Sequence, residues 1–205
     1  LPRTMEDLFE IATKNSGQKR DYDAKSIEVL EGLEPVRKRP GMYIGGTDSN
    51  AMHHLITEVF DNAMDEAVAG YASNLSIAIK ADNVIEISDN GRGIPVDKHP
   101  KYPDKSALEV ILTTLHSGGK FSGQAYQTAG GLHGVGISVV NALSEFTEVE
   151  VKRDGFQYAM TFSKGHKVKD LTKEPIKSKK SGTKVIFKPD FEIFEENIKF
   201  DPWRI

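Results

Sequence analysis

The order of apolar and polar residues along the chain predicts a mixture of helices and strands. Between residues 51 and 69 apolar side chains recur every three or four positions, which is typical of a helix with one face in a core. Gly70 follows directly, as expected where a helix ends. The apolar face consists of Met52, Ile56, Val59, Ala63 and Ala67, with Phe60 beside it.

Other stretches alternate apolar and polar residues with the period of two that is typical of strands. Two of them flank a short Asp-Asn turn and predict a hairpin. A second hairpin is predicted to turn at Asp154 and Gly155. The predicted strands lie at 75–80, 84–89 and 182–190 and in the hairpin 147–165, and a further helix is predicted at 106–117.

Because the strands come in hairpins without regular helical crossovers, the pattern favours an α+β fold. We expect helices on one face of a mixed, mostly antiparallel sheet. Residues 1–25 are polar apart from a short amphipathic piece, so we expect a flexible N-terminal arm ahead of a domain at 26–205. Residues 191–205 contain no obvious closing element, and the chain is expected to be part of a longer protein.

The composition is that of a globular protein, with 38% hydrophobic and 28% charged residues. The sequence has no apolar run long enough to span a membrane and no secretory signal, so the cytoplasm is the expected compartment. Zero cysteines exclude disulfides and thiolate chemistry. A net charge of -3 argues against an extended duplex-binding surface, and the basic runs at 37–39 and 177–184 are interpreted as solvated.

A glycine-rich stretch, TAGGLHGVGISVVNAL at 128–143, precedes a predicted helix start, where backbone N–H groups can face a phosphate. A dinucleotide fingerprint fails, because Val139 stands where its third glycine belongs. A P-loop fails at Lys120, because Thr114 stands six residues before it and Phe121 follows it. A structural turn and a phosphate cradle both remain open for this stretch.

Polar residues share one face of the predicted helix at 51–69, opposite its apolar face. They are His54, Glu58, Asn62 and Asp65. One interpretation is a solvated surface. The other is a reaction centre, in which Glu58 is the general base for a water, His54 orients it, and Asn62 offers an oxygen to Mg²⁺, with Asp61 and Asp65 as weaker candidates.

The predicted strand at 84–89 ends in a carboxylate, because alternation places Asp89 on the same face as two isoleucines. Asp89 is expected either to cap the following turn or to accept a hydrogen bond from the exocyclic amine of a purine. Gly91 and Gly93 follow and permit the close approach of a ligand. In the strand at 182–190, Thr183 lies at the rim of the core face and is either an ordinary strand residue or shares a water with Asp89.

Four motifs in this order, EVFDN, DNGRGIP, GGLHGVG and GT, resemble the GHKL (Bergerat) ATP-binding fold, a two-layer α/β sandwich shared by gyrase, Hsp90, histidine kinases and MutL. From about Tyr22 to Asp190 the chain is more closely similar to the ATPase domain of bacterial type IIA topoisomerases. Within these, the stretch at 99–131 and Ile137 look more like ParE, the ATPase subunit of topoisomerase IV, than its gyrase counterpart, GyrB.

The resemblance implies ATP and Mg²⁺ as cofactors. Glu58 is then the catalytic base held by His54, Asn62 coordinates Mg²⁺, and Asp89 accepts from the adenine amine, with a water shared by Thr183 and Gly93. Further implied nucleotide contacts are Ile94, Pro95, Lys120, Tyr126, Leu132, His133, Gly134, Val135 and Gly136. Aminocoumarin inhibitors of the family bind at the mouth of the nucleotide pocket. The residues implied there are Arg92, which pairs with Glu66, together with Asp65 and Arg153.

The resemblance also implies partners. The arm, with Tyr22 and Ile27, reaches the site of a second copy in an ATP-dependent dimer that closes a gate on DNA, and a ParC-like or GyrA-like subunit cleaves the DNA. A following domain supplies a lysine to the γ-phosphate, so slow turnover is expected of this chain alone. The alternatives are a GyrB ATPase domain and a nucleotide-gated module of the Hsp90 or MutL kind. A histidine kinase is disfavoured, because it needs no glutamate like Glu58.

Overall fold

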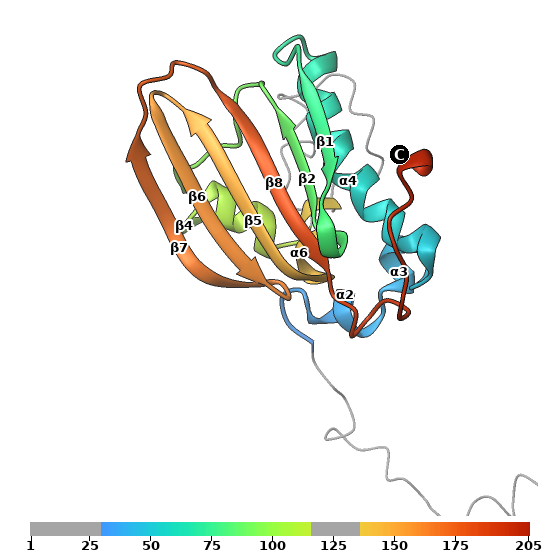
Figure 1. Cartoon of the computed structure of the whole chain (residues 1–205). Helices are drawn as coiled ribbons and strands as arrows, with labels where there is room; N and C mark the ends of the chain where they lie inside the picture. The colour runs from blue at the N-terminus through green and yellow to red at the C-terminus, as the bar shows by residue number, and fades with distance from the viewer. Residues whose placement is uncertain (1–29, 116–135) are drawn as a thin grey trace, which may run out of the picture. The chain divides into compact units, whose positions relative to one another are not determined.

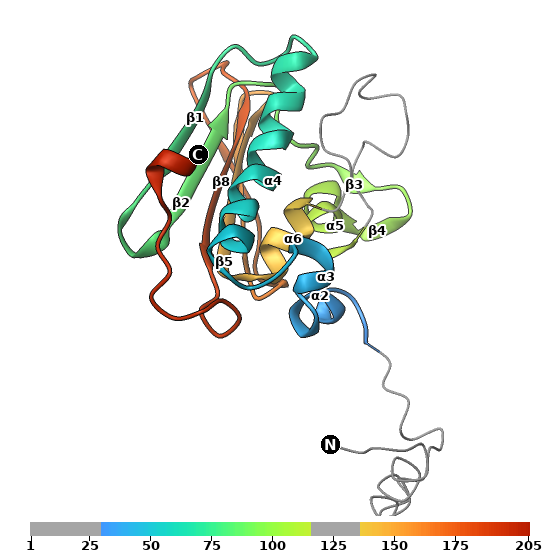
Figure 2. The same ribbon diagram turned by 90° about the vertical axis from the view of Figure 1, so that its right-hand side faces the viewer.

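Helices cover one face of a six-stranded sheet (Figures 1 and 2). The structure is a computed structural model, and it describes residues 30–115 and 136–205. The predicted α+β class, with helices on one face, is confirmed. The strand order is β1-β2-β8-β5-β6-β7, and each of these neighbouring pairs is antiparallel.

The bounds of the strands agree closely with the alternating pattern. The predicted turn at Asp154 and Gly155 is present, with φ angles of 51° and 80°. The strands of the main sheet are β1 (Leu75–Ile79), β2 (Ile85–Asp89), β5 (Ser144–Arg153), β6 (Phe156–Ser163), β7 (His166–Pro175) and β8 (Gly182–Pro189). A separate two-stranded sheet pairs β3 (Lys98–His99) with β4 (Tyr102–Ser106).

The longest described helix is α4, which begins after Asp48, where the side chain of Asp48 accepts from Ala51 N at 2.9 Å. The predicted helix at 106–117 is shorter than expected, because Thr114 is already extended. The helices are α2 (Glu34–Lys38), α3 (Gly41–Ile44), α4 (Ser49–Val68), α5 (Ala107–Thr113) and α6 (Gly136–Ala142), with 3-10 turns η3 (Ala81–Asn83) and η5 (Pro202–Arg204). Within the described residues, no helix has the length and apolarity needed to cross a membrane.

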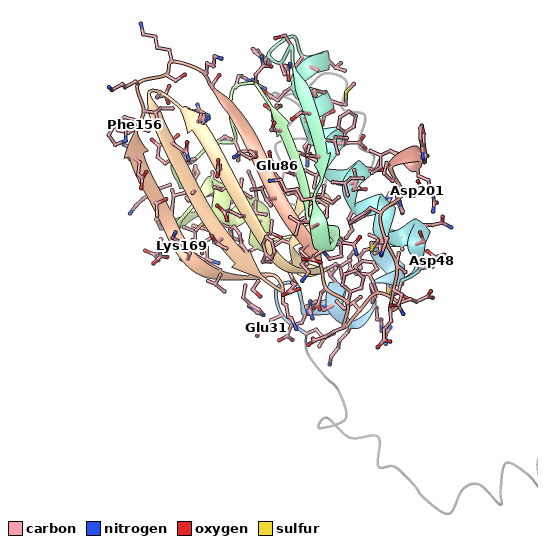
Figure 3. The ribbon with its side chains drawn as sticks, in the orientation of Figure 1. Glu31, Asp48, Glu86, Phe156, Lys169 and Asp201 are labelled. Carbon is pink, nitrogen blue, oxygen red and sulfur yellow. The ribbon has the colours of Figure 1, made fainter. Side chains whose placement is uncertain are left out.

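The core lies between α4, α5 and α6 on one side and the sheet on the other. Its largest fully buried side chains include Phe162 and Phe187 from the sheet and Met52 and Leu55 from α4. Each such side chain contributes about 1.5–3 kcal/mol by leaving water. The opposite face of the sheet is polar: Glu86 lies there and pairs with Lys80 at 2.5 Å (Figure 3).

A mostly buried ion pair joins α2 to the residue that follows β8, and the same arginine also bonds the end of α6. Arg37 Nη1 donates to Ala142 O at 2.7 Å, and Arg37 Nη2 donates to Asp190 Oδ2 at 2.7 Å. Asp190 is 3% exposed. Burial alone would raise the pKa of Asp190, but the hydrogen bonds from Arg37 and from Glu192 N, with the charges of Arg37 and Lys164, lower it.

Arg37→Met is expected to lower the free energy of unfolding by about 2–4 kcal/mol at pH 7, because it takes from the buried Asp190 carboxylate the guanidinium that donates to it at 2.7 Å. Asp190 has a lowered pKa in the folded chain, so its stabilisation is present above its ordinary pKa of 3.8 and is lost as the pH falls through the lowered value. The cost of Arg37→Met should therefore shrink in acid. Urea unfolding at several pH values measures it.

Lys188→Met is the matched control, because Lys188 pairs at 2.7 Å with Glu145, whose side chain is 51% exposed. An exposed pair of this kind contributes about 0–1 kcal/mol. Equal costs for Arg37→Met and Lys188→Met would contradict a special role for the buried pair.

Candidate functional site

Three polar side chains of α4 lie next to one another, as the helical spacing predicts. His54 Nε2 is 3.1 Å from Glu58 Oε1, so the predicted pair of base and orienting histidine is in contact. Asn62 Nδ2 donates to Glu58 O at 3.1 Å. The side chain of Glu58 is 18% exposed. A mostly buried carboxylate beside an imidazole can hold a water and take its proton.

This helix face is only partly solvated: the side chain of His54 is 41% exposed, whereas that of Glu58 is 18% exposed. Asp65 and Glu66 are buried. The exposed positions of α4 are instead Asn50, Thr57, Met64 and Val68. Asp65 and Glu66 therefore point into the protein, between the apolar stripe and the exposed side of the helix.

Glu66 and Arg92 form the predicted ion pair. Arg92 Nη2 is 2.6 Å from Glu66 Oε1, and Arg92 N donates to Glu66 Oε2 at 2.9 Å. The Arg92 guanidinium also lies over the ring of Tyr71, with Cζ 3.7 Å from the ring centroid. These contacts fix the loop that follows β2 against the end of α4.

Asp89 is the last residue of β2 and lies at the rim of the core. Its Oδ1 accepts from Gly91 N at 2.7 Å, so the turn-capping role exists. Burial raises the pKa of Asp89; hydrogen bonds from the backbone N–H groups of Gly91 and Thr183 oppose this, and the nearby charge of Glu66 adds to it. A carboxylate has about four lone-pair positions, so capping the turn leaves room for a further donor.

Thr183 and the loop after β2 are joined directly. Ile94 N donates to Thr183 Oγ1 at 3.2 Å, and Thr183 is 8% exposed. Gly93 has a φ of 79°, and a Cβ there would lie 3.0 Å from Lys152 O, so the position requires glycine. Of the predicted pocket residues, Ile94 is partly buried and Pro95 is exposed.

Sequence reasoning missed the role of Gly182. A Cβ at this position would lie 2.2 Å from Asp89 O, and the φ of Gly182 is 149°. Only glycine allows β8 to pass so close to the carboxyl end of β2. Its place directly before Thr183 in the GT motif was the available signal.

Gly136, the first residue of α6, lies against the candidate base. A Cβ at Gly136 would be 2.0 Å from Glu58 Oε2. The absence of a side chain here lets the start of α6 approach the Glu58 carboxylate. The end of the glycine-rich stretch therefore contacts α4 at the candidate base, which the sequence analysis did not predict.

Gly136→Ala is expected to reduce the ATP turnover that the resemblance implies by about 100-fold, because the new methyl group displaces the Glu58 carboxylate from His54. Gly46→Ala is the matched control: a Cβ at Gly46 has ordinary contacts at 4.0 Å. Phosphate release measures the effect, with the chain joined to the following domain that the resemblance implies. Equal turnover in the two variants would show that Glu58 tolerates the methyl group.

An open pocket of about 600 Å³ borders this site. Arg153 Nη1 donates to Gly93 O at 3.3 Å, which places the two predicted mouth arginines at one pocket. Lys179 and Ser181 also line it and were not predicted; the basic run at 177–184 was the signal. The lining residues are Arg92, Arg153, Asp154, Gly155, Lys179 and Ser181.

Several predicted contacts fall on residues 1–29 and 116–135, outside the described residues. These are Tyr22, Ile27, Lys120, Tyr126, Leu132, His133, Gly134 and Val135.

Comparison with known proteins agrees with the resemblance. The profile of the family described as histidine kinase-, DNA gyrase B- and HSP90-like ATPase matches residues 47–193. The B subunit of DNA topoisomerase 4 from Rickettsia felis is 63% identical over 98% of this chain and 31% of that protein. Its counterpart from Caulobacter vibrioides is 60% identical over 94% of this chain and 28% of that protein. The chain thus spans about a third of these relatives.

Gyrase is also similar, at lower identity. The B subunit of DNA gyrase from a Synechocystis species is 54% identical over 88% of this chain and 17% of that protein. The crystal structure of the 43K ATPase domain of Thermus thermophilus gyrase B, in complex with an aminocoumarin, has a TM-score of 0.73 and 48% identity over 84% of this chain and 42% of that chain. With the GHKL fold and a matched profile over most of its length, the chain belongs to the histidine kinase-, DNA gyrase B- and HSP90-like ATPase family.

Proposed function

We propose that this chain is the ATP-binding and hydrolysing domain of a bacterial type IIA topoisomerase, namely of a topoisomerase IV ParE subunit. The observation that carries the proposal is the Glu58 carboxylate, held by His54 at 3.1 Å and flanked by Asn62 and Gly136. The higher identity to the topoisomerase 4 relatives than to the gyrase relative supports the choice between the two.

Glu58 acts as the general base. Its carboxylate takes a proton from a water as the water oxygen attacks the γ-phosphorus, and the bond to the β,γ-bridging oxygen breaks, so that ADP leaves. His54 orients the carboxylate. The low exposure of Glu58 excludes competing water and strengthens these contacts.

Asp89 recognises the base. Its ionised carboxylate accepts from the exocyclic amine of adenine, whereas guanine presents a carbonyl oxygen in the corresponding place and would meet the carboxylate as a second acceptor. Thr183 and Gly93 complete this end of the pocket. Arg92, Arg153 and Lys179 at its mouth suit a polar or anionic group.

Asn62 fits a role in holding Mg²⁺. Its Nδ2 donates a hydrogen bond to Glu58 O, so the side-chain amide oxygen is left as a hard ligand for the ion. A Mg²⁺ ion that bridges phosphates usually keeps several waters and takes one or two ligands from the protein. The ion neutralises phosphate charge when bound.

The domain at 26–205 acts within a larger cytoplasmic assembly. The arm at 1–25 reaches the site of a second copy when ATP is bound, and the resulting dimer closes a gate for DNA. Lys120, Tyr126 and residues 132–135 contact the nucleotide. A cleavage subunit of the ParC or GyrA kind cuts the DNA.

Calorimetric titration tests the first step of this proposal. The chain is titrated with a non-hydrolysable ATP analogue and with the matching GTP analogue. The ATP analogue is expected to bind at least about tenfold more tightly, which corresponds to one hydrogen bond to a charged acceptor. Equal affinities, or no binding of either, would overturn the proposal.

A further inference from the structure

We infer that His53 is a positioning residue that fastens residues 198–204, here called the C-terminal clasp, to the first turn of α4. The helix that carries Glu58 and the clasp then move together. The link to the nucleotide rests on the proposed function; the fastening itself does not.

Both ring nitrogens of His53 are bonded to backbone groups. Nδ1 lies 2.7 Å from Ser49 O, and Nε2 accepts from Asp201 N at 2.8 Å. The ring therefore carries its proton on Nδ1 and offers Nε2 as an acceptor. His53 is 7% exposed, so these bonds are shielded from water.

Further contacts hold the clasp in place against α4 and Asn83. The ring of Phe200 packs edge-on against the His53 ring, with 5.4 Å between centroids. Asn83 donates to Ile198 O and accepts from Phe200 N, both at 3.1 Å. Arg204 bonds the side chains of Ser49 and Asn50. Figure 3 shows Asp201 beside α4.

The position of His53 argues for more than packing. An apolar side chain would fill the same space, but only a group with a donor and an acceptor bonds Ser49 O and Asp201 N together. His54, the next residue, contacts Glu58. Because a helix is stiff over one or two turns, a shift of the first turn of α4 displaces both His54 and Glu58.

Amide hydrogen exchange, followed by NMR, tests the fastening. In His53→Leu the amide of Asp201 is expected to exchange about five to ten times faster than in the wild type, the change that follows from losing one hydrogen bond. In His53→Gln the amide oxygen can replace Nε2 as acceptor, so most of the protection should return. Trp203, the single tryptophan, is 95% exposed, and its fluorescence anisotropy should fall in His53→Leu and return toward the wild-type value in His53→Gln.

Lys199→Ala is the matched control, because Lys199 is exposed and lies within the clasp. Its exchange should equal that of the wild type. Asn83→Gly removes the two hydrogen bonds that Asn83 makes to the clasp, and it replaces His53→Leu in this test if that variant does not fold. Asn83 has a φ of 58°, which glycine adopts freely. Wild-type exchange at Asp201 in His53→Leu, or in Asn83→Gly where that variant replaces it, would overturn the inference.

A non-hydrolysable ATP analogue tests the link to the site. Binding should slow exchange at Asp201 by at least about fivefold in the wild type, because a nucleotide that favours the fastened clasp lowers the population in which the clasp is open. Unchanged exchange in a wild-type chain that binds the analogue would overturn the link. Absence of binding by calorimetry would overturn the proposed function instead, and the fastening would still be read from the nucleotide-free chain.

Discussion

Glu58→Gln is expected to reduce ATP turnover by about 100- to 10,000-fold, because an amide cannot take the proton of the attacking water. Glutamine keeps the size of the side chain and its hydrogen bond to His54, so nucleotide affinity should change little. Phosphate release measures turnover with the chain extended to the length of its relatives. Calorimetry measures binding with the chain itself.

Thr57→Ala is the control for Glu58→Gln, because Thr57 is the preceding residue and is exposed. It should turn over ATP as the wild type does. If Glu58→Gln hydrolyses at the wild-type rate while binding is intact, Glu58 is not the base. If binding itself is lost, Glu58 holds the nucleotide rather than the water.

Asp89→Asn is expected to weaken binding of the ATP analogue by roughly 10- to 100-fold, because the adenine amine loses a charged acceptor. Asparagine can still accept from Gly91 N through its amide oxygen, which turns its NH₂ group toward the base. That group is a donor and suits the carbonyl of guanine, so the preference for ATP over GTP should shrink further. Calorimetric titration with both analogues measures the effect.

The pKa of Asp89 gives this prediction a pH dependence. Burial raises that pKa above the ordinary 3.8, and only the ionised carboxylate accepts from the amine. Affinity for the ATP analogue should therefore be full above the raised value and fall as the pH drops through it. The fall should be absent in Asp89→Asn.

The contribution of Asp89 to the free energy of unfolding should change with pH in the direction opposite to the nucleotide affinity. A folded-state pKa above the unfolded value means that Asp89 favours the folded chain below pH 3.8, and that this contribution is lost as the pH rises through the raised pKa. Asp89→Asn should therefore unfold at an equal or higher temperature at pH 7. Asp170→Asn, at an 87% exposed carboxylate, is the control for both measurements. If Asp89→Asn binds the ATP analogue more weakly and also unfolds at a lower temperature, loss of folded protein accounts for the weaker binding. That result would contradict a role of Asp89 in base recognition.

The sequence predicted α4 and its reactive face because both depend on local spacing. The contact between His54 and Glu58 follows from their separation of four residues on one helix. The burial of Asp65 and Glu66 does not follow from that spacing, because it depends on the loop after β2. Arg92 comes from that loop and covers Glu66.

The sequence analysis missed elements whose apolar and polar residues show no clear period. β7 is an edge strand with mostly exposed residues, so its sequence lacks the alternation that marks the buried strands. Pro35 and Pro40 suggest helix breaks from sequence alone, whereas Pro35 lies in the first turn of α2 and Pro40 precedes α3. Proline is tolerated at a helix start because its missing N–H has no partner there.

The close approach of Gly182 to Asp89 O could not be predicted from the alternating pattern either, because it depends on how two strands pair. The alternating pattern puts both residues at strand ends. Only the pairing of β2 with β8 brings them together.

The open pocket lined by Arg92 and Arg153 differs from the site around Asp89 in how many substitutions the fold tolerates. Its rim includes Lys179, which is exposed and can change at little cost to the fold. At Gly182, by contrast, a single added carbon would collide with Asp89 O. A compound anchored on the rim is therefore open to resistance by substitution, whereas one anchored on Asp89 and the backbone around Gly182 leaves the protein few tolerable replacements.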